Sequence, residues 1–241
     1  MVSVKRLTII GTSVALRVRP PADNDNFNYG QRLEKQLNSS FEEQQWIVSN
    51  LGFSRAVIRD VLRNKNLYAQ KGGDYIVLHI GAVDAPSREV PLWFSDLLAE
   101  HNKGKLSYYL SNALNARIIK KIRPFLVKLR LKRSWTSMNR FENGVRELLL
   151  FLRKDTPGRI IVLGINAGND RVEKALPGTN RKYKSYNEKL EAICNEMNTD
   201  FVSVEDLNSA EHYPDGVHYN SAGHKEVAER IKQLIINLEE K

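Results

Sequence analysis

Five short runs of apolar, mostly β-branched residues occur along the chain. They span residues 7–10, 46–48, 75–78, 160–163 and 201–204. Each run is continuously apolar rather than alternating, which is typical of strands that helices cover on both faces of a parallel sheet. The pattern therefore predicts a buried five-stranded parallel sheet.

Apolar residues three or four positions apart lie between these runs and predict helices. The stripes are Phe27, Gly30, Leu33 and Leu37; Val57, Ile58, Val61 and Leu62, with Ser54 as the expected cap; Tyr186, Leu190, Ile193 and Met197; and Val227, Ile231, Leu234 and Leu238. Alternating strands and helices predict a three-layer α/β/α fold over residues 1–241 as one domain. Residues of about 88–153 exceed a normal crossover and predict a helical insertion or lid.

Composition narrows the class of protein. With 241 residues, of which 41% are hydrophobic, the chain is long enough to bury a core. The single cysteine, Cys194, excludes an internal disulfide and a multi-cysteine zinc site. No apolar run reaches the roughly 18–20 residues of a membrane span, and the N-terminus does not resemble a signal peptide. We expect a cytoplasmic protein, and no metal or organic cofactor is implied.

The formal net charge of +9 is concentrated in one segment. Residues 102–140 contain eleven lysines and arginines and no acidic residue, and apolar residues recur there from Leu106 to Leu129. Three interpretations stay open for the basic segment 103–133: a lid whose apolar stripe packs on the domain, a surface for anionic membranes, or one for anionic glycans. Nucleic acid is disfavoured because no aromatic-interleaved stacking platform is present.

Candidate catalytic residues follow the first and last predicted strands. Ligands of open parallel sheets bind at the carboxyl ends of the strands. Ser13 lies in Gly11-Thr12-Ser13 directly after the first strand, and Asp215 and His218 follow the fifth. A serine hydroxyl becomes an effective nucleophile when a base removes its proton. His218 can be that base, and Asp215 can orient it.

These motifs resemble the SGNH or GDSL-type serine hydrolases. The block from Asp215 to Asn220, followed by Gly223 and His224, is very similar to the last block of that family, and Ser13 matches its nucleophile. The resemblance implies a flavodoxin-like fold, a Ser13–His218–Asp215 triad, and an oxyanion hole from the backbone amides of Ser13 and Gly52. The usual third-block asparagine, a side-chain donor to the oxyanion, is replaced by Val83.

Several polar residues near these loops are candidates for binding substrate. Arg17, Arg19 and Arg88 match the geometry of carboxylates and phosphates, although ion pairs with Asp23 or Asp84 would also account for them. Asp84 is a further candidate, or a structural acceptor of backbone hydrogen bonds. Substitutes for the missing asparagine are Asn50, Asn166 and Asn169.

The sequence therefore predicts an SGNH-type serine esterase that removes, or transfers, an O-acyl group on a saccharide through an acyl-enzyme. The segments at residues 13–20 and 79–88 are also similar to a branch of this family associated with bacterial surface-polysaccharide biosynthesis. Two alternatives stay open: a catalytically weak or inactive carbohydrate-binding protein of the same fold, and a peripheral membrane protein that acts through the basic segment. The oligomeric state is not indicated.

Overall fold

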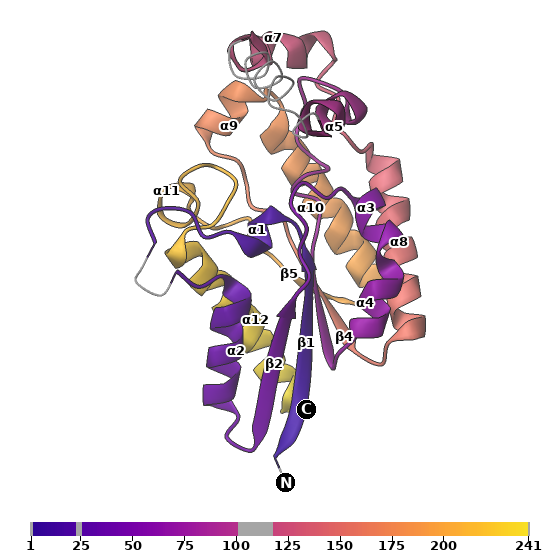
Figure 1. Ribbon diagram of the computed structural model, residues 1–241, viewed down its shortest axis with the longest axis vertical. Helices are drawn as coiled ribbons and strands as arrows, with labels where there is room; N and C mark the ends of the chain where they lie inside the picture. The colour runs from indigo at the N-terminus through magenta and orange to yellow at the C-terminus, as the bar shows by residue number, and fades with distance from the viewer. Residues whose placement is uncertain (1, 23–25, 101–117, 241) are drawn as a thin grey trace.

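A central parallel sheet organises the protein (Figure 1). A computed structural model of the chain describes residues 2–22, 26–100 and 118–240. The strands are β1 (Ser3–Gly11), β2 (Gln44–Asn50), β3 (Tyr75–His79), β4 (Arg159–Leu163) and β5 (Asp200–Val202). Their order in the sheet is β2-β1-β3-β4-β5, and all neighbouring pairs are parallel. This topology confirms the predicted α/β fold with five parallel strands.

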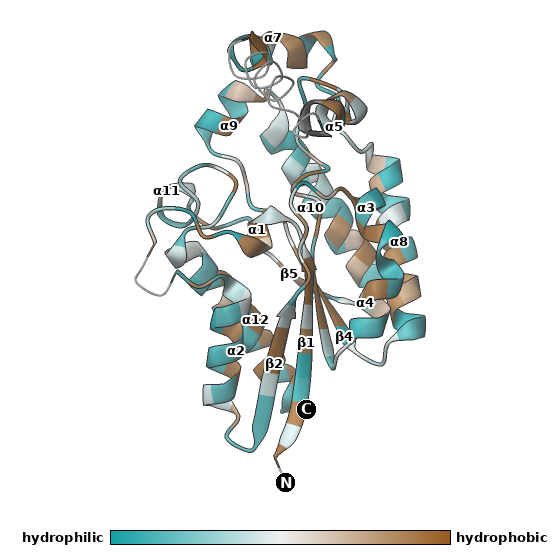
Figure 2. Cartoon of the chain, viewed as in Figure 1, coloured by the Kyte–Doolittle hydropathy of each residue, from teal (hydrophilic) through white to brown (hydrophobic). Residues whose placement is uncertain are grey.

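Helices cover both faces of the sheet. Helices α2 and α12 pack together on one face, whereas α3, α4, α8 and α10 lie on the other (Figure 1). The described helices are α1 (Ser13–Leu16), α2 (Tyr29–Ser40), α3 (Ile58–Arg63), α4 (Lys65–Lys71), α5 (Leu92–Glu100), α7 (Lys120–Leu129), α8 (Met138–Asp155), α9 (Asp170–Ala175), α10 (Thr179–Glu196), α11 (Ser209–His212) and α12 (Ser221–Glu239). Hydrophobic residues concentrate in the strands and on the helix faces turned toward them (Figure 2).

Local capping explains where two of the layer helices begin. Helix α2 starts after Asn28, whose side chain accepts from the Gln31 N–H at 3.1 Å, while Gln31 Oε1 accepts from the Asn28 N–H at 3.0 Å. This reciprocal pair is a capping box. In α12, the Asn220 side chain accepts from the Gly223 N–H at 2.9 Å. These caps hold the first turns of two helices that border the carboxyl edge of the sheet.

Helix α3 does not begin at the residue that the sequence predicts. Ser54 was the expected cap, but the helix starts at Ile58, whose N–H donates to Asp84 Oδ1 at 2.9 Å. Asp60 in the first turn accepts from the Val57 N–H at 3.2 Å. The carboxylate of Asp84, 26 residues further along the chain, therefore accepts at the start of the helix in place of the predicted cap Ser54.

Of the described helices between β3 and β4, α5 and α7 project beyond the carboxyl end of the strands, whereas α8 packs along one face of the sheet (Figure 1). The expected apolar positions Leu106, Leu110 and Leu114 lie outside the described residues. In the continuation of that stripe, Ile118, Ile122, Phe125 and Leu129 are exposed, and Leu126 is partly buried.

The orientation of α7 follows from its arginines. Arg123 pairs with Glu89 at 2.9 Å, and Arg130 donates to the backbone carbonyl of Arg88 at 2.7 Å. These contacts turn the arginine side of the helix toward the domain, where Val127 is also buried, while Ile122, Phe125 and Leu129 face outward. Within the described residues, no helix is both long and apolar enough to span a membrane.

Candidate active site

The first half of the site is the turn from β1 into α1. Strand β1 ends at Gly11, and Ser13 is the first residue of α1. A Cβ atom at Gly11 would lie 2.9 Å from Ala15 Cβ and 3.3 Å from the His79 carbonyl oxygen, so only glycine permits this tight turn. The turn places Ser13 at the carboxyl edge of the sheet, with 9% of its surface exposed.

The second half is the loop between α11 and α12. His218 Nε2 lies 3.1 Å from Ser13 Oγ, and His218 Nδ1 lies 2.9 Å from Asp215 Oδ2. Gly216, between the aspartate and the histidine, has a φ of +85°, which the chain adopts readily only with glycine. Ser13 and His218, which are separated by 205 positions, are thus within hydrogen-bonding distance, and Asp215 contacts the other ring nitrogen of His218.

The carboxylate of Asp215 is held in its ionised form. Burial raises its pKa, but hydrogen bonds from the His218 ring and from the backbone N–H groups of His218 and Val217 outweigh burial and lower the pKa to about 2. An ionised acceptor at Nδ1 fixes the His218 tautomer with its free lone pair on Nε2, facing Ser13. The arrangement can therefore take a proton from the serine hydroxyl.

Ser13, Asp215 and His218 line a cavity of about 670 Å³. Two of the predicted binding residues, Arg17 and Arg88, also line it. Arg19 does not line it but lies beside the triad, with its Nε 3.5 Å from Asp215 Oδ2. Val83, at the position of the expected asparagine, lines the cavity with an apolar side chain.

The other predicted binding residues have structural contacts and do not line the cavity. Asp84 is buried and accepts from Ile58 and Thr136. Asn50 donates to the Ala15 carbonyl oxygen at 2.9 Å, and its Oδ1 accepts from the Gly52 N–H at 3.2 Å. Asn166 lies 3.4 Å from the Val217 carbonyl oxygen.

These contacts bear on the predicted oxyanion hole. The Gly52 amide is hydrogen-bonded within its own loop, so it could serve a ligand only by exchanging the Asn50 contact. Asn169, the third expected substitute, donates to the Pro214 carbonyl oxygen at 3.1 Å and accepts from the Val172 N–H. The three asparagines therefore hold loops together. The roles of the Ser13 and Gly52 amides stay predictions.

The structure also places residues in this cavity that sequence reasoning missed. These are Val14, Ser54, Arg55, Ala82, Pro86, Arg123, Trp135, Arg171, Val172, Ala175, Leu176, Tyr183 and Val217. Arg123 and Trp135 belong to residues 102–140, the stretch that stands out in the sequence for its positive charge and its lack of acidic residues, but nothing in the sequence assigned these two residues to the site. Arg171 carries no such signal, because it is an ordinary exposed arginine in the first turn of α9.

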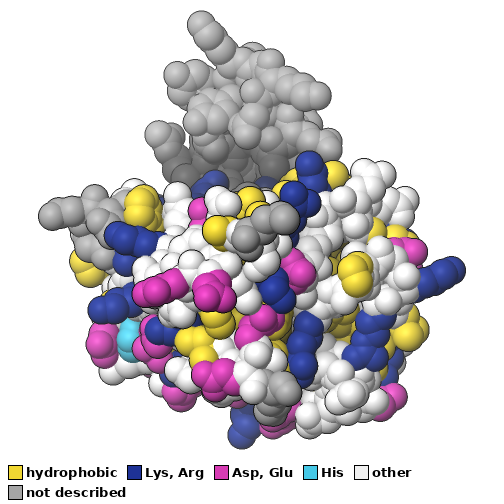
Figure 3. Space-filling view, turned by 90° about the horizontal axis from the view of Figure 1, so that it is seen from below, with side chains coloured by type: hydrophobic (Ala, Val, Ile, Leu, Met, Phe, Trp, Pro, Cys, Tyr) yellow, Lys and Arg dark blue, Asp and Glu magenta, His cyan; other side chains and the backbone are white. Residues whose placement is uncertain are grey.

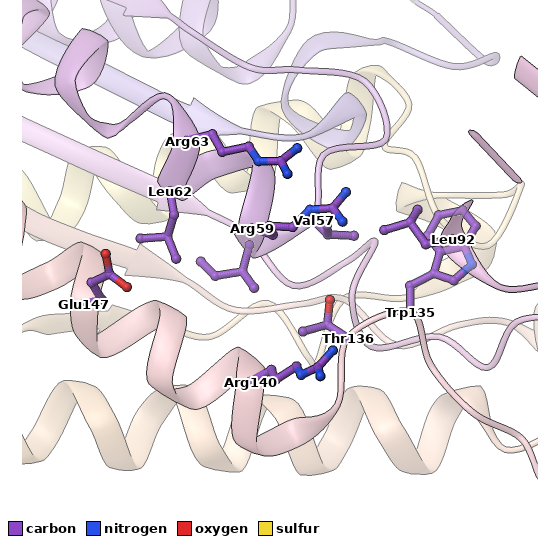
Figure 4. Close-up of a pocket in the computed structure, with 10 residues that line it drawn as sticks. Val57, Arg59, Leu62, Arg63, Leu92, Trp135, Thr136, Arg140 and Glu147 are labelled. Atoms are coloured by element: carbon purple, nitrogen blue, oxygen red, sulfur yellow. The ribbon is translucent and has the colours of Figure 1, made fainter. Parts of the chain in front are cut away.

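A second cavity of about 410 Å³ lies on the other side of Trp135, which lines both. Figure 4 shows Leu62 and Arg63 on α3 facing Arg140 and Glu147 on α8, with Trp135 and Leu92 at the far end. Among the described residues that line it, none is a serine or a histidine. The Ser–His–Asp arrangement is therefore confined to the first cavity. Among the described residues, no three His, Cys, Asp or Glu side chains gather in a way that could hold a metal ion.

Comparisons with known proteins show the family and the fold of the chain. The GDSL-like lipase/acylhydrolase family matches residues 9–226. Comparison with curated proteins gives no significant match.

Among solved structures, the acetylxylan esterase Axe2 from Geobacillus stearothermophilus has a TM-score of 0.63 at 19% identity, over 96% of this chain and 94% of that chain. LAE5, an α/β hydrolase from the metagenome of Lake Arreo in Spain, also has a TM-score of 0.63, at 17% identity and the same coverage. At these identities the likeness shows a shared fold.

Proposed function

This chain belongs to the GDSL-like lipase/acylhydrolase family, and we propose that it is a serine esterase whose triad is Ser13, His218 and Asp215. The observation that carries the proposal is the continuous line of contacts from Ser13 Oγ through His218 to Asp215, at 3.1 and 2.9 Å. Structures of catalytic mutants of Axe2 carry substitutions of a serine, an aspartate and a histidine. The same three residue types meet here.

The proposed reaction has two steps. Ser13 Oγ attacks the ester carbonyl while His218 Nε2 accepts its proton, and His218 then protonates the departing alcohol, which leaves an acyl group on Ser13. In the second step His218 deprotonates water, which attacks the acyl-enzyme and releases the carboxylic acid and free Ser13. A second sugar hydroxyl in place of water would transfer the acyl group instead.

The proposed substrate is an O-acyl ester of a saccharide. Support comes from the shared fold with Axe2, an acetylxylan esterase. The cavity of about 670 Å³ has the size of a small-molecule site. The proposed oxyanion donors are the backbone amides of Ser13 and Gly52, without the asparagine side chain that Val83 replaces.

The test is labelling with a fluorophosphonate probe, combined with hydrolysis of p-nitrophenyl acetate. We expect stoichiometric labelling of the native protein, and loss of both labelling and hydrolysis in Ser13→Ala. Ser39→Ala, which removes an exposed hydroxyl on α2, is the matched control and keeps both. Absence of labelling in the folded native protein would overturn the proposal and favour a carbohydrate-binding protein without turnover.

A further inference from the structure

The cavity that contains Ser13 is strongly cationic. Among the described residues that line it, five are arginines, namely Arg17, Arg55, Arg88, Arg123 and Arg171. Asp215 is the only acidic residue in the described part of the lining, and its carboxylate is already bound to His218. The end of the molecule seen from below differs, because Lys and Arg side chains are interspersed there with Asp and Glu (Figure 3).

Three of the five arginines form no ion pair with a described carboxylate. Arg55 lies 3.7 Å from Asp96, and Arg123 lies 2.9 Å from Glu89, so both are paired. In the part of the chain that the structure describes, Arg17, Arg88 and Arg171 have no ion pair within 4.0 Å. Because an arginine side chain stays protonated, these three bring positive charge to the cavity without a direct ion pair.

Arg88 is held in place without being neutralised. Its guanidinium lies over the Trp135 ring at 3.9 Å from the ring centroid, and Nη2 donates to the Val83 carbonyl oxygen at 2.9 Å. Its Nε is buried and lacks a hydrogen-bond partner among the described residues. A guanidinium fixed by stacking loses little conformational freedom when it binds a ligand. Arg88 is therefore a preformed donor whose remaining N–H groups can face an anion.

Arg17 and Arg171 approach the cavity from two other elements. Arg17 directly follows α1, and its backbone carbonyl accepts from His224 Nε2 at 3.1 Å. Arg171 lies in the first turn of α9, and both side chains belong to exposed residues. The three unpaired arginines thus come from separate segments and share one cavity with Ser13 and His218.

We propose that the ester substrate is an anion: an O-acylated saccharide whose carboxylate or phosphate group is bound by Arg88, with Arg17 and Arg171 at the cavity mouth. This inference rests on the proposed esterase function and adds the class of substrate. Guanidinium groups bind carboxylates and phosphates through paired, charge-assisted hydrogen bonds. The substrate's acidic group would supply the direct ion-pair partner that these arginines lack among the described residues.

The first experiment measures binding and does not depend on turnover. Glucuronate, glucose 6-phosphate and glucose are titrated into the Ser13→Ala protein by calorimetry. We expect at least one of the two acidic sugars to bind about tenfold or more tightly than glucose, which corresponds to about 1.4 kcal/mol. Raising the salt concentration from 0.05 to 0.5 M should reduce this preference, since salt screens charges near the surface. The stronger of the two acidic ligands identifies the group as carboxylate or phosphate.

Arginine variants locate the charge. Arg88→Gln and Arg171→Gln should each lower the affinity for the acidic sugar several-fold and leave glucose binding nearly unchanged. Arg88→Lys keeps the charge but loses the paired geometry, so it should bind with intermediate affinity. The matched control is Arg140→Gln in the second cavity, which should leave both affinities unchanged. Equal binding of acidic and neutral sugars by the native protein, or an Arg140→Gln effect as large as that of Arg88→Gln, would overturn the inference.

A turnover comparison separates this inference from the proposed function. The native enzyme is given acetylated methyl glucuronide and acetylated methyl glucoside at matched positions. Hydrolysis of both at the same kcat/KM would overturn the anionic substrate and leave the esterase intact. If the protein binds acidic sugars preferentially but is not labelled by a fluorophosphonate, the esterase function is overturned and the binding of anionic sugars stands. A preference of about tenfold for the glucuronide ester, lost in Arg88→Gln, supports both.

Discussion

Asp215 holds His218 at two points: Oδ2 lies 2.9 Å from His218 Nδ1, and Oδ1 accepts from the backbone N–H of His218 at 2.7 Å. The first contact orients the imidazole, and the second fixes the turn that carries it. A spacing of three residues makes both contacts available to a single carboxylate. This local unit faces Ser13, which lies 205 positions away in the sequence.

Asp215→Asn should separate orientation from folding. An asparagine can still accept the backbone N–H bonds, but it does not stabilise a cationic imidazole and can favour the wrong tautomer. We expect kcat for p-nitrophenyl acetate to fall by about 10²-fold or more, with little change in the urea midpoint. Asp155→Asn, at the exposed end of α8, is the control and should retain native kcat. Retention of more than half of the activity in Asp215→Asn would remove Asp215 from the triad.

Arg19→Gln should affect the same carboxylate from the other side. Arg19 Nε lies 3.5 Å from Asp215 Oδ2, and both side chains are partly exposed, so the ion pair is screened. Without this cation, Asp215 attracts a proton on His218 more strongly. The acidic limb of the kcat/KM–pH profile should therefore move to higher pH by a fraction of a unit, while kcat at the optimum changes less than tenfold. An unmoved limb, or a shift to lower pH, would contradict an electrostatic effect of Arg19 on the Asp215–His218 pair.

Val83→Asn tests the altered oxyanion hole. Val83 lines the cavity and is 8% exposed, so an asparagine here would place an amide donor beside the reacting carbonyl. One such donor typically changes kcat by about 10²–10³-fold, and we expect an increase of at least about tenfold. Val83→Ala is the control, because it enlarges the cavity without adding a donor. An equal gain in both variants would assign the effect to space rather than to hydrogen bonding.

Asp84 should make stability depend on pH. Burial raises its pKa from 3.8 to about 6, although hydrogen bonds from Thr136 and Ile58 oppose the shift. Between about pH 4 and 6 the folded protein holds a proton that the unfolded chain has lost. Ionisation of Asp84 therefore lowers the free energy of unfolding as the pH rises through that window.

Asp84→Asn removes this ionisation. Relative to the native protein, the variant should gain stability between pH 4.5 and 7.5, by at most about 3 kcal/mol. The measurement is the difference in unfolding free energy between the two proteins, from urea titrations at each pH. For the control Asp155→Asn, the difference in unfolding free energy from the native protein should be the same at pH 4.5 and at pH 7.5. A difference for Asp84→Asn that is independent of pH would show that Asp84 is already ionised at the lower pH.

Gly216→Ala should damage the catalytic loop. Gly216 has a φ of +85°, and an added Cβ would lie 2.3 Å from Asn169 Oδ1 and 2.5 Å from Val172 Cγ2. The loop must move to relieve this overlap, which displaces Asp215 and His218. We expect both a lower thermal midpoint and a loss of kcat. Gly158→Ala is also crowded, 2.2 Å from the Gly73 carbonyl oxygen, but it lies at the start of β4 on the opposite edge. It should lower stability without a specific loss of kcat per folded molecule.

The sequence by itself determined the sheet and the positions of the proposed triad. A continuous apolar run indicates a strand that is buried on both faces, and this pattern can be read from residues that are adjacent in the chain. The five strands and their parallel arrangement could therefore be predicted. Ser13 follows the first run and Asp215 and His218 follow the last. The parallel fold brings the ends of those strands to one edge.

Tertiary structure alone decided how the charged side chains are partnered. Arg171 reaches the cavity from α9, Arg19 meets Asp215 rather than Asp84, and α7 turns Arg123 inward while Phe125 is exposed. Asp84 is a predicted candidate for binding substrate, but its carboxylate instead accepts the N–H of Ile58, the first residue of helix α3. Long polar side chains have no periodic pattern that reports their partners, because each pairing depends on which loops meet at the sheet edge. The burial of apolar residues can be predicted from the local sequence pattern, whereas these ion pairs and the cavity arise only from contacts between distant segments.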